Sequence, residues 1–173
     1  MKLTIVINGA GGVGKDTLCH IAEARYRVRN VSSITPIKQI AALCGWQGEK
    51  TDRARKFLSD LKLLTIAYND YPSHWLAEQY RSFLAGDEEI MFVHIREPQE
   101  IAKFVRLTGG AAKTLLVRGG ERMAKKVGKY GNPADDLVEN YPYDYYFAND
   151  RTVAEAEPAF LALLGEMMKD AEH

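Results

Sequence analysis

The residues Gly9-Ala10-Gly11-Gly12-Val13-Gly14-Lys15-Asp16-Thr17 follow directly on a short apolar run, Leu3–Ile7, that ends at Asn8. They have the spacing G-x-x-x-x-G-K of a phosphate-binding loop, with a predicted strand before and a predicted helix after. Glycines let backbone N–H groups converge on phosphate oxygens, the helix N-terminus adds its positive dipole end, and the Lys15 ammonium reaches the outer phosphates. The alternative is an ordinary glycine-rich turn. We predict a nucleotide-binding loop in which the contacts are Gly9, Gly11, Gly12, Val13, Gly14, Lys15, Asp16 and Thr17, with Lys15 also catalytic.

The residue after Lys15 departs from the usual motif, because Asp16 stands where serine or threonine is common. A hydroxyl at this position normally binds Mg²⁺. A carboxylate is an equally suitable hard oxygen ligand, so we expect Asp16 to bind the metal of a nucleotide·Mg²⁺ complex. Thr17 lies about 100° further around the helix and cannot simply replace it. The other interpretation is that Asp16 is an acid that stabilises the first helical turn.

Outward from the loop, apolar runs of strand length alternate with segments of helical periodicity. Strands are predicted at residues 3–7, 28–31, 90–95, 114–117 and 143–148. Helices are predicted directly after the loop, from Thr35 as N-cap to Gly45, over 51–69, from Pro72 to Gly86, from Pro98 to Gly109, and from a capping box at Thr152 onward. The helix over 51–69 is marked by the helical spacing of Phe57, Leu61, Leu64 and Tyr68. Pro158 is expected to kink or restart this last helix. The alternation predicts a doubly wound α/β domain with a parallel sheet.

The composition limits the class of protein. The 173 residues are 46 % hydrophobic and 27 % charged, which is enough apolar material for one sizeable core. Lys and Arg total 23, as do Asp and Glu, and this balance argues against a general nucleic-acid binder. No apolar run is long enough for a membrane span or a signal peptide, and two cysteines, Cys19 and Cys44, exclude a disulfide scaffold and a four-cysteine zinc site. We expect one soluble, cytoplasmic domain over residues 1–173, with no membrane or nucleic-acid partner.

Other motifs narrow the class of nucleotide-binding protein. A GTPase would carry a base-reading Asn-Lys-x-Asp segment, and the sequence has none. A motor-type ATPase would end an apolar strand with an acid for the metal, whereas the 90–95 run has His94. We interpret His94 as a packed histidine at the end of a strand. A small phosphotransferase with scattered arginines remains.

Further segments follow the loop in a characteristic order. They are Ile34-Thr35-Pro36-Ile37-Lys38, a stretch from Arg53 to Trp75, Arg96-Glu97-Pro98-Gln99-Glu100, and Tyr143-Asp144-Tyr145-Tyr146-Phe147-Ala148-Asn149-Asp150. Together with the loop, this layout resembles the deoxynucleoside monophosphate kinases of phages and bacteria, a branch of the P-loop nucleoside monophosphate kinase group. The resemblance spans most of the chain. That family usually has Asp-Val-Arg-x-Pro-Asn-Glu, so His94 stands in place of the family's acid.

The resemblance implies a P-loop NTPase three-layer fold, with a parallel sheet of about five strands between two layers of helices. It also implies transfer of the γ-phosphoryl group from ATP·Mg²⁺ to a nucleoside or deoxynucleoside monophosphate. Arg96 would hold the acceptor phosphate, since it follows the C-terminal end of a strand, where ligands of open α/β sheets bind. The helices within 34–84 would bind the acceptor through Lys38, Arg53 and Arg55, although the last two are too close in sequence to face one ligand together.

The segment 118–141 corresponds in this resemblance to a short mobile lid. It is basic and punctuated by glycines. Arg118 and Arg122 are four residues apart, so on a helix both can point at the transferring phosphoryl group, and we predict both as catalytic. The loop after the last strand borders the adenine in this group, which nominates Asn149 as a nucleotide contact.

Two other functions stay open. A kinase of the same fold could phosphorylate another small phosphate or an alcohol. A nucleotide-binding regulatory module with little catalysis also fits His94 and Asp16. Loss of the acid does not exclude a kinase, because a monophosphate has a second pKa near 6 and its attacking oxygen is ionised at pH 7. The acceptor and the oligomeric state are not determined by the sequence.

Overall fold

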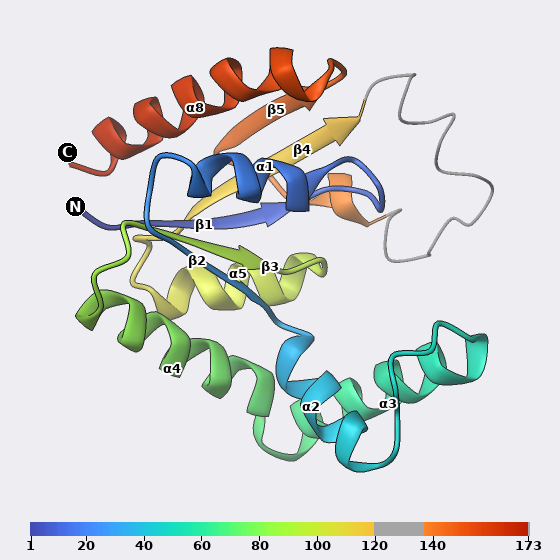
Figure 1. Cartoon of the computed structure of the whole chain (residues 1–173). Coiled ribbons are helices and arrows are strands. Elements are labelled where there is room, and N and C mark those ends of the chain that lie inside the picture. The colour runs from blue at the N-terminus through green and yellow to red at the C-terminus, as the bar shows by residue number, and fades with distance from the viewer. Residues whose placement is uncertain (120–136, 173) are drawn as a thin grey trace.

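The computed structural model describes residues 1–119 and 137–172. Within them, five parallel strands form one sheet in the order β2-β3-β1-β4-β5, and helices cover both faces (Figure 1). The strands are β1 (Leu3–Asn8), β2 (Val28–Ser32), β3 (Ile90–His94), β4 (Lys113–Gly119) and β5 (Tyr145–Asn149). The helices are α1 (Lys15–Glu23), α2 (Thr35–Leu43), α3 (Asp52–Asn69), α4 (Tyr71–Ala85), α5 (Pro98–Leu107) and α8 (Val153–Asp170), with a short 3₁₀ helix, η1 (Val138–Asn140). This confirms the predicted three-layer α/β fold.

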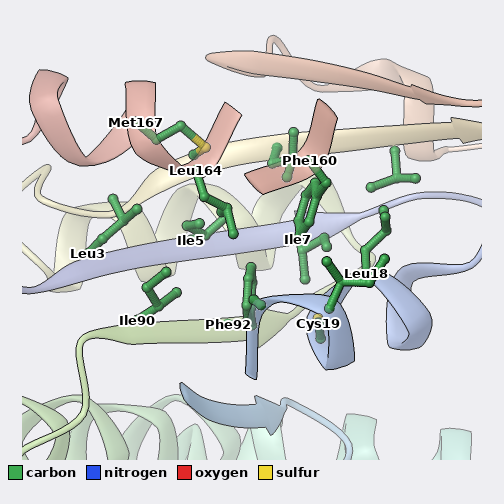
Figure 2. Packing of buried hydrophobic residues seen from close by; sticks show 14 of the residues in the cluster. Leu3, Ile5, Ile7, Leu18, Cys19, Ile90, Phe92, Phe160, Leu164 and Met167 are labelled. Carbon is green, nitrogen blue, oxygen red and sulfur yellow. The ribbon is translucent and has the colours of Figure 1, made fainter. Parts of the chain in front are cut away.

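The central strand β1 is buried along its whole length and separates two apolar cores. Leu3, Ile5 and Ile7 pack with residues of α1 and α8, as Figure 2 shows. Val6 points to the opposite face and packs with residues of α4 and α5. Burial of a large aliphatic side chain contributes about 1.5–3 kcal/mol, so both cores hold the strands firmly. Because all strands are parallel, their carboxyl ends share one edge of the sheet.

Helix α2 begins differently from the prediction. Thr35 was expected as the N-cap, but Ile34 is the N-cap and its carbonyl oxygen accepts a hydrogen bond from the Lys38 N–H at 2.9 Å. Thr35 is therefore the first helical residue and Pro36 the second. Proline is accepted there because the N–H groups of the first turn have no partner within the helix.

Helix α8 runs without interruption through Pro158, so the predicted restart does not occur. The capping box predicted at Thr152 is present. A proline inside a helix costs about 3 kcal/mol. Phe160, Leu164 and Met167 follow it and are fully buried, and each contributes about 1.5–3 kcal/mol to stability. Packing of α8 on the sheet therefore outweighs the local penalty.

Helix α3 forms where predicted, but it does not bury the side that its periodicity marks. Among its residues, only Ala54 is buried. α3 packs on α2 and α4. Helices α2 and α3 lie beyond the end of β2, whereas α4 runs alongside the sheet (Figure 1). The apolar side of α3 is thus part of the exposed surface. None of the helices in the described part of the chain is long and apolar enough to cross a membrane.

Candidate functional site

The glycine loop joins β1 to α1 at the carboxyl edge of the sheet. Gly9 has a φ of 153°, and a Cβ at this position would lie 2.5 Å from the carbonyl oxygen of Val117 in β4. Only glycine therefore lets the chain turn this closely past β4. Gly14 immediately precedes α1 with a φ of 89°, again in the region that favours glycine. The loop thus delivers the N-terminus of α1, with its positive dipole end, to this edge.

Lys15, the first residue of α1, bends back over this loop. Its Nζ donates hydrogen bonds to the carbonyl oxygens of Gly9 at 2.5 Å and Ala10 at 3.1 Å. The ammonium group is half-buried and lies against the loop backbone. This is the position where a cation can contact the outer phosphates of a bound nucleotide.

Asn8, the last residue of β1, is a positioning residue that sequence analysis missed. It is fully buried. Its Oδ1 accepts the Gly9 N–H at 2.9 Å, and its Nδ2 donates to the Arg96 carbonyl oxygen at 3.1 Å and to the Tyr143 hydroxyl at 2.9 Å. One side chain thereby fixes the start of the loop and the backbone of Arg96 together. The available signal was an amide at the end of an apolar strand, because a buried amide requires partners.

His94 ends β3 beside the loop. Burial lowers its pKa; the negative charge of Asp16 opposes this shift, and the positive charges of Lys15 and Arg96 add to it. His94 Nε2 lies 2.8 Å from Asn30 Oδ1, a hydrogen-bond distance. His94 is therefore a packed, neutral histidine, which agrees with the interpretation made from the sequence. Its electrostatic partners show that Lys15, Asp16 and Arg96 lie at the same end of the sheet.

Asn149 is the last residue of β5, and its side chain contacts the glycine loop. It is buried, and its Nδ2 donates to the carbonyl oxygen of Val13 at 2.8 Å. It lines a small pocket, with a cavity volume of about 50 Å³, between α1, the end of β5 and the start of α8; the lining residues are Gly14, Thr17, Leu18, Ile21, Asn149, Arg151, Val153 and Ala156. Three predicted nucleotide contacts, Gly14, Thr17 and Asn149, therefore meet in this pocket.

An ion pair joins α3 to the segment that carries Arg96. Lys62 Nζ donates to both carboxylate oxygens of Glu97, each at 2.9 Å, and the two side chains are only 13 % and 30 % exposed. Burial raises the pKa of Glu97, but the Lys62 ammonium outweighs it and leaves this pKa below its ordinary value. Glu97 follows Arg96 directly and is the N-cap of α5. The pair therefore fixes the backbone at Arg96 relative to α3, a connection that sequence analysis missed.

No protein-family model matches the chain, and no curated protein is similar to it in sequence. Solved structures match nearly its whole length. A gluconokinase from Sinorhizobium meliloti is 20 % identical, with a TM-score of 0.51 over 99 % of this chain and 98 % of its own. A shikimate kinase from Aquifex aeolicus is 12 % identical, with a TM-score of 0.52 over 95 % and 97 %. The APS kinase of Mycobacterium tuberculosis, in complex with AMPPNP and APS, is 15 % identical, with a TM-score of 0.50 over 95 % and 98 %.

The chain has the fold of the P-loop kinases. This confirms the coarser part of the predicted resemblance. The specific likeness to deoxynucleoside monophosphate kinases stays a prediction, since the three neighbours are named for three other acceptors.

Of the four residues predicted to bind the acceptor, Arg96 lies at the carboxyl edge of the sheet, and the other three lie on helices α2 and α3. Lys38 is exposed on α2, and Arg53 and Arg55 are both exposed on α3. Arg55 forms an ion pair with Asp52 at 3.6 Å. In the described part of the chain, no recorded contact joins these three side chains to the glycine loop. Their acceptor role therefore stays a prediction.

Arg118 lies on a strand, which corrects the proposed helical pairing with Arg122. It is in β4 and pairs in register with Ala148 of β5. Its guanidinium donates to Glu139 through Nε at 3.0 Å and Nη2 at 2.7 Å, and it stacks over the Tyr146 ring. Both members of this ion pair are more than half exposed, and solvated pairs contribute little, so a phosphate can compete with Glu139. Arg122, like most of the predicted lid segment 118–141, lies outside the described residues.

The predicted metal site rests on one carboxylate, that of Asp16. Among the described residues, no group of three or more histidine, cysteine, aspartate or glutamate side chains could hold a metal ion. Mg²⁺ does not need such a group, because it is commonly bound by one or two carboxylates together with substrate phosphates and water. Asp16 is exposed in the first turn of α1, directly after Lys15. Its carboxylate therefore fits a Mg²⁺ ion carried by a nucleotide.

Proposed function

We propose that this protein is an ATP-dependent phosphotransferase that moves the γ-phosphoryl group to a nucleoside or deoxynucleoside monophosphate. The observation that carries the proposal is that Lys15 and Arg96 lie at one edge of the sheet, where the buried Asn8 side chain bonds to the start of the glycine loop and to the backbone of Arg96. Lys15 serves the phosphates of the donor, and Arg96 serves a second phosphate group beside it. Two adjacent cationic positions suit a reaction between two phosphorylated substrates.

The other residues take roles that follow from their places. The loop amides and the α1 dipole bind the ATP phosphates, the Asp16 carboxylate would bind Mg²⁺, and Thr17 and Asn149 border the nucleoside end of ATP. Mg²⁺ supplies charge neutralisation of the phosphates when bound. Within the helices of residues 34–84, the acceptor is bound through Lys38, Arg53 and Arg55. Arg118 and Arg122, in the lid-like segment, stabilise charge on the transferring group.

The residue at the end of β3, His94, favours a phosphate acceptor over an alcohol. An alcohol has a pKa far above 7 and gains from a general base. Here the strand ends in His94, whose Nε2 is hydrogen-bonded to Asn30 and which lies beside two cations. The oxygen of a monophosphate is already ionised at pH 7 and needs no such base. The site therefore supports transfer to a phosphate.

An acceptor screen tests the proposal. The purified chain is given ATP and Mg²⁺ with each ribo- and deoxynucleoside monophosphate in turn, and ADP formation is measured. ADP formation that depends on a monophosphate is the expected result. Turnover with an alcohol or another small phosphate instead would identify a different P-loop kinase. Tight ATP binding without turnover on any acceptor would identify a regulatory module.

Arg96→Lys tests the acceptor site. A guanidinium holds a phosphate through two parallel hydrogen bonds that an ammonium cannot reproduce. We expect the KM for the monophosphate to rise about fivefold to tenfold, while the KM for ATP changes less than about twofold. Arg106→Lys, at the other end of α5, is the matched control. An equal effect on the KM for both substrates would show that Arg96 contacts the transferring phosphoryl group. No effect on either KM would show that Arg96 is a surface residue with no role in substrate binding.

Lys62→Met tests the link between α3 and Arg96. Without the ammonium, Glu97 is no longer anchored, and we expect the KM for the monophosphate to rise about threefold with little change in kcat or in the KM for ATP. The double variant Lys62→Glu with Glu97→Lys restores an ion pair and should recover most of the KM. Thermal melts of each variant separate this effect from loss of fold. If the swapped pair binds the monophosphate no better than Lys62→Met, the ion pair does not position Arg96.

A further inference from the structure

Tyr143 lies between η1 and β5 in the chain, and its side chain is a buried group that the proposed function does not use. It is only 6 % exposed. Its hydroxyl accepts a hydrogen bond from Asn8 Nδ2 at 2.9 Å and donates one to the Val138 carbonyl oxygen at 2.8 Å. Burial raises the pKa of Tyr143 to about 12. The hydroxyl therefore keeps its proton at neutral pH and acts as donor and acceptor at once.

These two bonds extend a chain of hydrogen bonds that starts at the glycine loop. Asn8 accepts the Gly9 N–H through Oδ1 and donates to Tyr143 through Nδ2. Tyr143 in turn donates to Val138, the first residue of η1. A buried polar network whose members are paired holds them in one arrangement. The Tyr143 hydroxyl therefore fixes η1 relative to the glycine loop.

Helix η1 also carries the partner of Arg118. Glu139 follows Val138 directly, and its carboxylate accepts hydrogen bonds from Arg118 Nε at 3.0 Å and Arg118 Nη2 at 2.7 Å. Two parallel bonds of this kind fix the plane of a guanidinium as well as its position. The hydroxyl of Tyr143 thus acts on Arg118 through Val138 and Glu139.

The ring of Tyr143 reaches Arg118 by a second contact. The rings of Tyr143 and Tyr146 meet edge to face, with their centroids 6.1 Å apart and their planes at 76°. The central carbon of the Arg118 guanidinium lies 4.7 Å from the centroid of the Tyr146 ring, which is within the range of a cation–π contact. One buried side chain therefore supports Arg118 twice, through its hydroxyl and through its ring.

We propose that Tyr143 is a positioning residue for phosphoryl transfer, which holds the Arg118 guanidinium in place relative to the glycine loop. This role rests on the proposed function, in which Arg118 stabilises charge on the transferring group. Such stabilisation depends on charges that are fixed before the reaction. Because the Arg118 side chain is 51 % exposed, its position depends on these contacts. A tyrosine that only filled the apolar core would need its ring but not its hydroxyl.

A double-mutant cycle tests this role. Tyr143→Phe keeps the ring and removes the hydroxyl, and we expect kcat to fall about threefold to fivefold, the size set by a weak, exposed ion pair, with both KM values within about twofold. Glu139→Gln should lower kcat by a similar factor. The double variant should fall no further, because both changes act through Arg118, whereas independent effects would multiply to about tenfold or more. Tyr145→Phe, whose lost hydroxyl bonds to Asp170, is the matched control and should keep the wild-type kcat.

Hydrogen exchange of the Arg118 Nε–H, followed by NMR, tests the positioning without turnover. This group donates to Glu139, so it should exchange at least about threefold faster in Tyr143→Phe and at the wild-type rate in Tyr145→Phe. A chain that binds ATP without turnover would overturn the proposed function, and the exchange rates would still decide whether Tyr143 holds Arg118. Unchanged exchange in Tyr143→Phe, an unchanged kcat in that variant, or a multiplied loss in the double variant would overturn the positioning role.

Discussion

Turnover by Lys15→Ala is expected to fall at least about a hundredfold, because the variant removes the ammonium that lies against the phosphate-binding loop. Charge builds up on the phosphate oxygens during transfer, and a fixed cation stabilises that charge more than it stabilises bound ATP. The loss should therefore appear mainly in kcat, with a smaller rise in the KM for ATP. Steady-state kinetics at saturating monophosphate measure both constants.

A stability control accompanies this variant. The Lys15 ammonium also donates hydrogen bonds to Gly9 and Ala10, and loss of such bonds costs about 0.5–1.5 kcal/mol each. A modest drop in Tm is thus compatible with the prediction, and unfolding at the assay temperature is not. Lys113→Ala, at the start of β4 and the opposite edge of the sheet, should retain full activity. Unchanged turnover in Lys15→Ala would remove the phosphate-loop interpretation altogether.

The loop could be predicted because its determinants are local. The apolar run of β1, the glycines and Lys15 are adjacent in sequence. Each has a reason that can be read locally: the run is buried, the glycines allow the tight turn, and Lys15 supplies the cation. The order of strands and helices could be predicted for the same reason. Helix α3 shows the limit of periodicity, because the spacing of its apolar residues (57, 61, 64 and 68) predicts a helix and its apolar side but not how far that side is buried. Pro158 shows a second limit, since a local penalty was overcome by burial of Phe160 and its neighbours.

The contacts that assemble the site could not be predicted from local pattern. Asn8 bonds to Arg96 across 88 residues and to Tyr143 across 135, and Asn149 bonds to Val13 across 136. Because the bonded residues are so far apart in sequence, the sequence alone shows only a polar residue at the end of each strand. Asn8 and Asn149 have the same position in the fold, since each is the last residue of a parallel strand, and the ends of parallel strands meet at one edge of the sheet. Strand-end amides next to a glycine loop are therefore the signal to look for.

Asp16→Ala is expected to act through the metal. The carboxylate is exposed in the first turn of α1, where it fits Mg²⁺ carried by a nucleotide and is unfavourable to bare phosphate. We expect turnover at low Mg²⁺ to fall roughly tenfold to a hundredfold, a range typical of disrupted metal sites. Metal-free ATP should bind the variant as well as it binds the wild-type chain, or better, because a negative charge has been removed.

Two comparisons separate metal binding from the simpler role of a helix-start acid. Asp16→Asn keeps an oxygen ligand without its charge, so a Mg²⁺ titration should show partial activity that rises with metal concentration. An acid that only stabilises the helix dipole would instead lower Tm and leave the Mg²⁺ dependence unchanged. Glu23→Ala, in the last turn of the same helix, should leave the Mg²⁺ dependence unaltered. Wild-type Mg²⁺ dependence and turnover in Asp16→Ala would assign Asp16 to the helix start alone, because a metal ligand cannot be removed without shifting the metal titration.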